Sequence, residues 1–211
     1  MVSVIIRNHN ERDYIGFAIQ SVFNHIPNAE ILVIDDQSTD DSLDVVRLFM
    51  NRGDIKILKI DDYTPGKSIN YGVGIASYET ILVLSAHSQI TKMDLGYVQS
   101  LLKFHSAVFG NQTPIYRGKK ISKRYIWSHF VDNDVVNMHS TIEDRPFLHN
   151  AFCFYNKSDL IETPFDEELS TKEDRYWAID ILKEGKSYLY TPKIEVNHYY
   201  TGNGATSKGL G

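Results

Sequence analysis

The 211-residue chain lacks several features that mark whole classes of protein. Cys153 is its only cysteine, which excludes an internal disulfide and a metal site built from several cysteines. No apolar run approaches the roughly 20 residues that span a bilayer, and the start, MVSVII, lacks the basic region of a signal peptide. Its 22 basic and 27 acidic side chains give a net charge of −5, which excludes a strong general affinity for nucleic acid. We therefore expect a cytoplasmic protein.

Three motifs of nucleotide and ester chemistry are also absent. No G-x-G-x-x-G follows the first apolar run, which argues against a dinucleotide-binding dehydrogenase. The phosphate-binding G-x-x-x-x-G-K-[ST] and the G-x-S-x-G of α/β-hydrolases are missing as well. A nucleotidyltransferase is disfavoured because the segment after the first run, RNHNER, has no glycine to approach a phosphate.

The first half of the chain alternates apolar runs of strand-like composition with amphipathic stretches. The runs predict strands over 2–6, 31–34, 55–60 and 81–84, with helices around 15–23, 43–50 and 68–76 between them. Buried strands that alternate with helices predict an α/β fold with a mostly parallel central sheet and flanking helices. In such sheets ligands bind at the carboxyl ends of the strands.

The second half of the chain is less regular. It predicts strands over 106–112 and 194–198, a helix over 171–183, and a further apolar run at 151–155. The basic stretch at 117–124 is predicted to be a solvated loop, and the glycine-rich end at 201–211 a flexible tail. Because no repeat or linker divides the chain, we expect one domain over 1–211.

Polar side chains follow three of the predicted strands, at 7–10, 35–36 and 85–88. Asp35 and Asp36 could accept hydrogen bonds from a nucleobase or a ribose hydroxyl, but an Asx-turn followed by a helix cap at Asp40 would explain them equally well. His87 could bind a transition metal, although a lone histidine is more often an ordinary hydrogen-bonded residue. Local spacing leaves both questions open.

Carboxylates also crowd the segment STKEDRYW at 170–177, which opens a predicted helix. Thr171 and Asp174 have the spacing of a capping box, with Asp in place of the usual Glu or Gln. A carboxylate near a helix N-terminus is stabilised as the ion, which also suits a general base. The spacing does not decide between a cap and a base.

Taken in order, five segments resemble the inverting GT-A-type glycosyltransferases of family two. They are VSVIIRNHNERDYIGFAIQSVFNH, EILVIDDQSTDDSLDVV, PGKSINYGVGIAS, FDEELSTKEDRYWAIDILKEG and YTPKIEVNHY. The second is similar to the family's nucleotide-binding VDDGSTD segment, and the fourth resembles the helix that carries its ED pair. Single motifs of this kind are weak, but five in the right order make a specific signal.

The resemblance implies a GT-A (Rossmann-like) fold in which residues 1–112 bind the nucleotide sugar and residues 113–200 form the acceptor and catalytic side. It places Asp174, with Glu173 beside it, as the base that deprotonates the acceptor. The donor-binding positions that it implies are Asn8, Asn10, Asp35, Asp36, Lys67, Asn70, Ser85 and His87.

At the place of the family's metal-binding D-x-D this chain has SAH, with Ser85 and His87 at the two aspartate positions. In this it resembles a bacterial subgroup that is labelled rhamnosyltransferase-like and has a downstream stretch echoed here by VFGNQTP at 108–114. The diphosphate's charge could be neutralised by Mn²⁺ or Mg²⁺ held by His87 and His198 with help from the diphosphate itself. The other route is cationic side chains, for which Arg7, Lys67, Arg117, Lys119, Lys120 and Lys208 are available.

The implied function is inverting transfer of a hexosyl or deoxyhexosyl group from a UDP- or dTDP-sugar to a hydroxyl of a glycan or lipid-linked acceptor. The expected setting is bacterial surface polysaccharide synthesis, such as that of capsule or lipopolysaccharide. A lipid-linked acceptor would bring the protein to the inner face of the cytoplasmic membrane as a peripheral protein. The alternative is a non-catalytic nucleotide-sugar or glycan-binding domain with a degenerate metal site.

Overall fold

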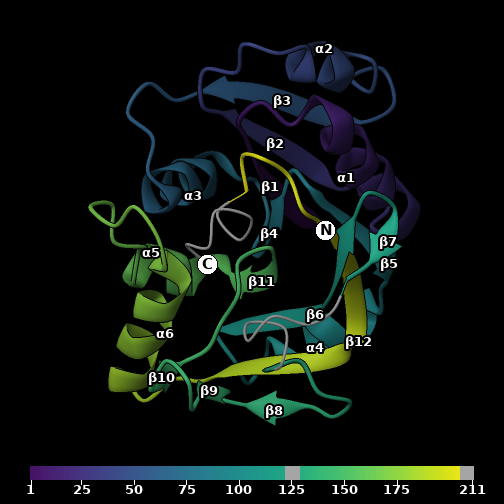
Figure 1. Cartoon of the computed structure of the whole chain (residues 1–211). Helices are drawn as coiled ribbons and strands as arrows, with labels where there is room; N and C mark the ends of the chain where they lie inside the picture. The colour runs from purple at the N-terminus through teal and green to yellow at the C-terminus, as the bar shows by residue number, and fades with distance from the viewer. Residues whose placement is uncertain (122–128, 205–211) are drawn as a thin grey trace.

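Apolar runs form the strands of one large sheet in the computed structural model, which describes residues 1–121 and 129–204 (Figure 1). Within those residues the sheet has ten strands: β1 (Val2–Asn8), β2 (Glu30–Asp35), β3 (Asp54–Lys59), β4 (Thr80–Ser85), β5 (Ser88–Lys92), β6 (Ala107–Tyr116), β7 (Lys119–Lys120), β8 (Val135–Val136), β11 (Phe152–Asn156) and β12 (Tyr188–Tyr199). A separate antiparallel pair is formed by β9 (His139–Ser140) and β10 (Arg145–Pro146). The helices are α1 (Arg12–His25), α2 (Ser42–Arg47), α3 (Pro65–Ile75), α4 (Leu95–Leu101), α5 (Lys157–Glu162) and α6 (Glu173–Lys183).

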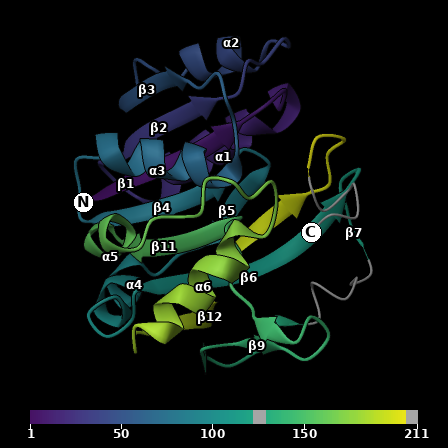
Figure 2. The same cartoon turned by 90° about the vertical axis from the view of Figure 1, so that its left-hand side faces the viewer.

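The sheet is parallel in its first half and mixed in its second. The order of its main path is β3-β2-β1-β4-β11-β6-β12-β5. The first four of these strands are mutually parallel, whereas β11 runs antiparallel to both β4 and β6 (Figure 2). The N-terminal end of β11 therefore lies at the same edge of the sheet as the carboxyl ends of β1 and β4.

Helices cover both faces of the sheet, as the alternation of side chains along each strand requires. Val4 and Ile6 of β1 belong to one core cluster, together with apolar residues of α1, α2 and α4. Ile5, between them, belongs to a second cluster with residues of α3, α5 and α6, which lie together in front of the sheet in Figure 2. Burial on both faces explains why the strand sequences are continuously apolar. The predicted α/β fold is confirmed.

The starts of helices α3 and α6 differ from the prediction. Helix α3 begins at Pro65, because the hydroxyl of Thr64 accepts the N–H of Lys67 at 3.1 Å and proline suits a first helical position. Helix α6 begins at Glu173, after Lys172 in a left-handed conformation with φ of 63°, and no side chain caps it. The capping-box interpretation of Thr171 and Asp174 is therefore wrong.

Several elements have no clear sequence signal. The strand β5 and the helices α4 and α5 were not predicted, and the segment 194–198 is the end of the longer strand β12.

Of the expected tail, 201–204 are described and 205–211 lie outside the described residues. Two residues of the basic stretch, Lys119 and Lys120, form the exposed strand β7, and residues 122–124 also lie outside. No helix within the described ranges is both long and apolar enough to cross a membrane.

Candidate active site

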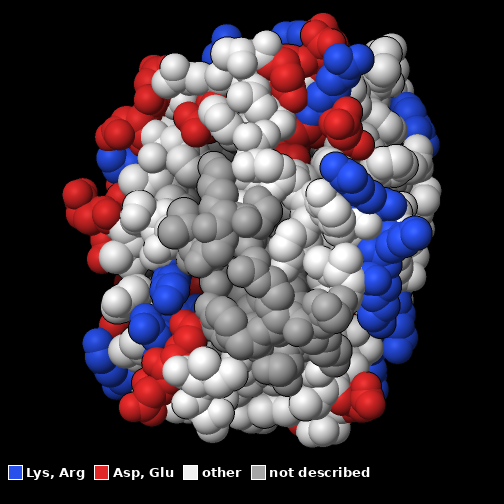
Figure 3. All heavy atoms as spheres, in the orientation of Figure 1, with Lys and Arg blue, Asp and Glu red and all other residues white. Residues whose placement is uncertain are grey.

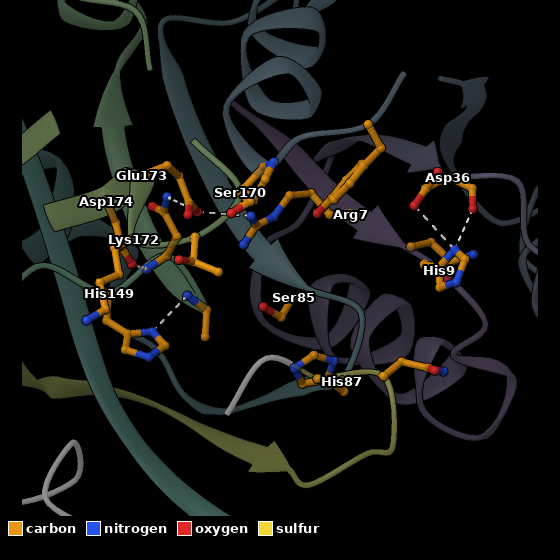
Figure 4. A pocket seen from close by; sticks show the side chains of 18 of the residues that line it. Arg7, His9, Asp36, Ser85, His87, His149, Ser170, Lys172, Glu173 and Asp174 are labelled. Atoms are coloured by element: carbon orange, nitrogen blue, oxygen red, sulfur yellow. Dashed lines mark hydrogen bonds and ion pairs between the residues drawn. The ribbon is translucent and has the colours of Figure 1, made fainter. Parts of the chain in front are cut away.

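A pocket of about 470 Å³ opens where β1, β2 and β4 end (Figure 4). Its volume falls in the range of small-molecule and cofactor sites. The residues that line it are Arg7, Asn8, His9, Glu11, Asp36, Tyr63, Pro65, Ser85, His87, His149, Asn150, Ala151, Ser170, Thr171, Lys172, Glu173, Asp174, Arg175, His198, Asn203 and Gly204. Because β1, β2 and β4 are parallel, the predicted polar clusters at their ends do meet at this edge.

The two aspartates after β2 have different roles in the structure. Asp35 is buried, and its carboxylate accepts hydrogen bonds from Nδ2 of Asn8 at 2.7 Å and from the hydroxyl of Ser38 at 2.6 Å. Asp36 instead lines the pocket, where the ring of His9 lies against it: Nδ1 is 2.6 Å from the backbone oxygen of Asp36 and 3.4 Å from its carboxylate. Asp36 is thus the carboxylate that a ligand can reach, and Asp35 fixes the loop.

The asparagines after β1 hold the loop that follows β2. Oδ1 of Asn10 accepts the backbone N–H groups of Thr39 and Asp40 at 2.7 and 3.1 Å. Asn10 does not line this pocket; it borders an adjoining one that also includes Arg117. Asn8 lines the pocket while it is bonded to Asp35.

Two predicted donor-binding residues lie outside the pocket. The amide of Asn70 is bonded to the backbone oxygen of Phe165 and to the carboxylate of Glu167, both at 2.9 Å. The ammonium of Lys67 pairs with Asp62. Neither side chain lines the pocket, and their donor-binding role stays a prediction. Both lie on α3, whose polar side chains here bind neighbouring loops.

The other cationic candidates also differ in whether they line the pocket. Arg7 lines the pocket, whereas Lys119 and Lys120 are exposed on β7, and Lys208 lies outside the described residues. Figure 3 shows lysine and arginine side chains gathered along the side of the molecule where Figure 1 places β5 and β7. Among the candidates that the structure describes, Arg7 is therefore the one that lines this pocket.

The carboxylates of Glu173 and Asp174 lie together at the N-terminus of α6, both buried. Oδ2 of Asp174 accepts the backbone N–H of Asn150 at 3.0 Å and the guanidinium of Arg175 at 2.9 Å. Oε1 of Glu173 accepts Nδ2 of Asn150 at 3.1 Å and the guanidinium of Arg7 at 3.0 Å. Asn150 thus bonds to both acids, and each also has its own arginine.

The two acids sit close enough to influence each other's charge. Burial, and then the negative charge of Asp174, raise the pKa of Glu173 above its ordinary value. The positive charge of Arg7 and the hydrogen bond from Asn150 oppose this rise. An acid with a raised pKa beside a second carboxylate is typical of sites of proton transfer.

Two histidines that are far apart in the sequence meet in the pocket, His87 just before β5 and His198 on β12. The rings of His87 and His198 lie 5.0 Å apart between centroids because β5 and β12 pair in the sheet. Nδ1 of His87 is 3.1 Å from Glu11, and Nδ1 of His198 is 2.8 Å from the side-chain oxygen of Gln112. Since both partners are acceptors, Nδ1 donates in each ring.

His87 and His198 could supply some, but not all, of the ligands of a divalent cation. A carboxylate or amide oxygen that fixes the Nδ1–H of a histidine is the usual outer support of a metal-binding Nε2. Burial, followed by the neighbouring His87 and His149, lowers the pKa of His198 well below its ordinary value, which keeps its ring neutral, as ligation requires. Within residues 1–121 and 129–204, however, no three His, Cys, Asp or Glu side chains are grouped to hold a metal. A cation bound to His87 and His198 would therefore need further ligands from the diphosphate, and imidazole suits Mn²⁺ better than Mg²⁺.

Some pocket residues were not singled out from the sequence. His9 lies within a polar cluster that was noted, but the ring was not distinguished from its neighbours. His149 and Asn150 precede β11, and they reach the pocket because that strand is antiparallel to β4. A search limited to the carboxyl ends of parallel strands cannot find them. Glu11 and Arg175 had no sequence signal of their own.

Figure 4 shows the two ends of the pocket. Asp36 and His9 form one end, Glu173 and Asp174 form the other, and Ser85 and His87 lie between them. A ring and a carboxylate at one end can hold a flat, hydrogen-bonding group. The paired acids at the other end can accept a proton. An elongated substrate that reacts at one end would match this arrangement.

Known proteins are similar to this chain in sequence and in fold. The chain is 27% identical over 203 residues to the minor teichoic acid biosynthesis protein GgaA of Bacillus subtilis, covering 89% of this chain and 44% of that protein. It is 26% identical over 194 residues to the GalNAc(5)-diNAcBac-PP-undecaprenol β-1,3-glucosyltransferase of Campylobacter jejuni, covering 90% and 62%. The chain thus spans less than two thirds of either relative.

Solved structures agree in fold. The crystal structure of S. aureus TarS 1–349 with UDP-GlcNAc has a TM-score of 0.75 at 20% identity, covering 98% of this chain and 60% of that one. The mannosyltransferase PcManGT of Pyrobaculum calidifontis with GDP-Man and Mn²⁺ has a TM-score of 0.74 at 16% identity, covering 98% and 59%. These neighbours are GT-A glycosyltransferases, and the family model described as Glycosyl transferase family 2 matches residues 3–163. The chain therefore belongs to glycosyl transferase family 2.

Proposed function

We propose that this chain transfers a sugar from a nucleoside-diphosphate sugar to a hydroxyl of a glycan or lipid-linked acceptor, with inversion at the anomeric carbon. Surface polysaccharide synthesis is the proposed setting, because relatives include a teichoic acid biosynthesis protein and a glucosyltransferase of an undecaprenol-linked glycan. In this proposal residues 1–112 bind the donor, and residues 113–200 supply the base and the acceptor side. A lipid-linked acceptor would bring the protein to the inner face of the membrane.

One observation carries the proposal. A single pocket has Asp36 and His9 at one end and the acids Glu173 and Asp174 at the other. The carboxylate of Asp36 can accept an N–H of a base or a ribose hydroxyl, and the ring of His9 can lie against the base. The diphosphate then extends past Ser85 and His87 towards the acids, which brings the sugar next to a proton acceptor.

Asp174 is the proposed base. Its carboxylate is held by the backbone of Asn150 and by Arg175, so its direction is fixed before the substrate binds. It takes the proton from the acceptor hydroxyl while the oxygen attacks the anomeric carbon on the face opposite the diphosphate. The new C–O bond forms as the bond to the diphosphate oxygen breaks, and the nucleoside diphosphate leaves with the electron pair. Attack from the opposite face inverts the anomeric configuration.

Charge on the leaving diphosphate has to be neutralised during the reaction. His87 and His198 are the residues that would hold a divalent cation, and such a cation supplies positive charge to the diphosphate. Cationic side chains that line the pocket are the other source of positive charge. Ser85 can donate a hydroxyl hydrogen bond but brings no negative charge with which to attract a metal.

Donor turnover tests the proposal directly. The protein would be incubated with UDP-, dTDP- and GDP-sugars in Mn²⁺, Mg²⁺ or EDTA, and nucleoside diphosphate release would be measured with water or a short-chain lipid-linked glycan as acceptor. We expect turnover with one nucleotide class and, by NMR, a product of inverted anomeric configuration. Asp174→Asn should lower turnover by about 10²- to 10⁴-fold while the nucleotide still raises the melting temperature.

Asp180→Asn is the matched control, since Asp180 lies on the exposed side of the same helix and pairs with Lys183. It should leave turnover unchanged. The non-catalytic alternative predicts a different result, namely a nucleotide-induced rise in melting temperature with no turnover under any condition. A product that keeps the donor's anomeric configuration would contradict the inverting mechanism.

A further inference from the structure

Arg7 occupies an unusual position for an arginine, at the end of a central strand of the sheet. It pairs in register with Ile34 of β2 and Ser85 of β4, and only 15% of its side chain is exposed. Withdrawing a guanidinium from water is costly unless a charged partner compensates it. The partner lies 166 residues further along the chain, at the start of α6.

That partner is Glu173, whose Oε1 accepts from the guanidinium at 3.0 Å. The same oxygen accepts Nδ2 of Asn150, and the hydroxyl of Tyr155 donates to the side-chain oxygen of Asn150. The glutamate is therefore held in one place by groups from β1 and from the segment that leads into β11. Asp174, next along the helix, shares Asn150 with it through the backbone N–H.

The charges around Glu173 explain why this support is needed. Asp174 faces it from its own helix as a second negative charge, and the hydroxyls of Tyr63 and Tyr155 face it from the segment before α3 and from β11. Burial keeps both tyrosines neutral by raising their pKa values. Of the groups identified around Glu173, Arg7 is the one that brings a full positive charge into contact with it.

From this we infer that Arg7 is a positioning residue. Through Glu173 it keeps that acid ionised and holds the pair in place, so that Asp174 is positioned to take the acceptor's proton. Without Arg7, Glu173 would keep a proton more readily, and the pair would be less effective as a base. The inference rests on the proposed function and adds to it a residue that acts without touching the acceptor.

The pH dependence of turnover tests the inference. Arg7→Gln and Arg7→Lys would be compared with the wild type from pH 5 to 9, with kcat and the donor KM measured separately. For Arg7→Gln we expect the acidic limb of kcat to move up by about 1 pH unit or more, since an opposite charge at this distance shifts a carboxyl by 1–3 units. Arg7→Lys should return the limb towards the wild-type position, and the donor KM should change less than about threefold.

Arg47→Gln is the matched control, because Arg47 forms an exposed pair with Asp44 on α2, and this variant should keep the wild-type profile. If Arg7→Gln raised the donor KM tenfold while the acidic limb stayed in place, Arg7 would instead bind the diphosphate directly. That result would overturn the inference and leave the proposed function intact.

A second measurement does not depend on turnover. In Arg7→Gln the buried Glu173 should keep its proton in the folded state to higher pH than in the unfolded state, so stability falls as pH rises. The melting temperature of Arg7→Gln should thus drop below that of Arg7→Gln/Glu173→Gln by an amount that widens from pH 5 to 8, and by more than the wild type drops below Glu173→Gln. If the two differences in melting temperature were equal at every pH, Arg7 would not control the charge of Glu173. If the wild type turned over no donor, the proposed function would fail, and this comparison would still decide whether Arg7 controls the charge of Glu173.

Discussion

The side chain of Asn70 forms two hydrogen bonds with the backbone of Phe165. Its Nδ2 donates to the carbonyl oxygen at 2.9 Å, and the N–H of Phe165 donates to its Oδ1 at 3.0 Å. These bonds attach the segment before α6 to α3. Because that segment leads directly to Glu173 and Asp174, an asparagine outside the pocket can fix where the acids lie.

Asn70→Ala should therefore affect the protein through this segment. Loss of the two bonds to Phe165 is expected to cost about 1–3 kcal/mol of stability, because the backbone groups lose their partner. Turnover should fall more than donor affinity, since the acids move while the Asp36 end of the pocket does not. Chemical denaturation and nucleotide titration would measure both. A large loss of donor affinity at unchanged stability would instead support the predicted donor-binding role of Asn70.

Gly66 is expected to tolerate no side chain. A Cβ there would lie 2.3 Å from the backbone oxygen of Asp166, closer than any real contact. Gly66→Ala should push the 165–167 segment away from α3 and cost about 1–3 kcal/mol. Gly74→Ala in the same helix is the control: its Cβ meets nothing within 4 Å, so the change should be neutral or stabilise by about 0.5–1 kcal/mol. Equal melting temperatures for the two variants would show that Gly66 does not pack closely against the backbone of Asp166.

Glu30 should make folding stability depend on pH in the acid range. Burial alone would raise the pKa of its carboxyl, but hydrogen bonds from Lys56, Ser3 and Ser77 lower it to about 2. A lowered folded-state pKa stabilises the protein above the unfolded value of 4.5, and that stability is lost as the pH falls towards 2. Glu30→Gln should cost up to about 3 kcal/mol at pH 7, with most of the difference from wild type lost near pH 2.

Denaturation of both proteins from pH 2 to 7 would measure this effect. Lys56→Met is a useful comparison, because 44% of the lysine side chain is exposed and its pair should contribute less than about 1 kcal/mol. A difference between Glu30→Gln and wild type that stays constant over the whole pH range would show that the carboxylate charge is not involved.

Metal removal should distinguish the two routes of charge neutralisation. If His87 and His198 hold a cation, UDP or another cognate nucleotide should bind more tightly in Mn²⁺ than in Mg²⁺ or EDTA. His87→Ala and His198→Ala should each abolish that preference. Glu11→Gln should weaken Mn²⁺ affinity by about 10- to 100-fold, because Glu11 supports the ring of His87. Calorimetry with nucleotide and Mn²⁺ would measure these changes, and binding unaffected by EDTA would favour charge neutralisation by cationic side chains of the pocket.

Much of the Asp36 end of the pocket could be predicted from the sequence. The apolar runs of β1, β2 and β4 and the polar residues that follow them are local patterns, and parallel pairing brings their ends together by necessity. Asp36 and Ser85 at the pocket follow from that rule alone. The family resemblance likewise follows from five short segments in order, because each is contiguous in the chain.

Only the tertiary structure decided the rest. His87 meets His198 through the pairing of β5 with β12, and Asn150 meets both acids because β11 runs against its neighbours. Sequence spacing has no information on either contact, since strand direction and order are set by packing between distant segments. The same holds for Asn70 and Asp35, whose types suit ligand binding but whose polar groups are bonded to neighbouring loops. A residue's type determines which chemistry it can perform, whereas the surrounding contacts determine whether its atoms are available for it.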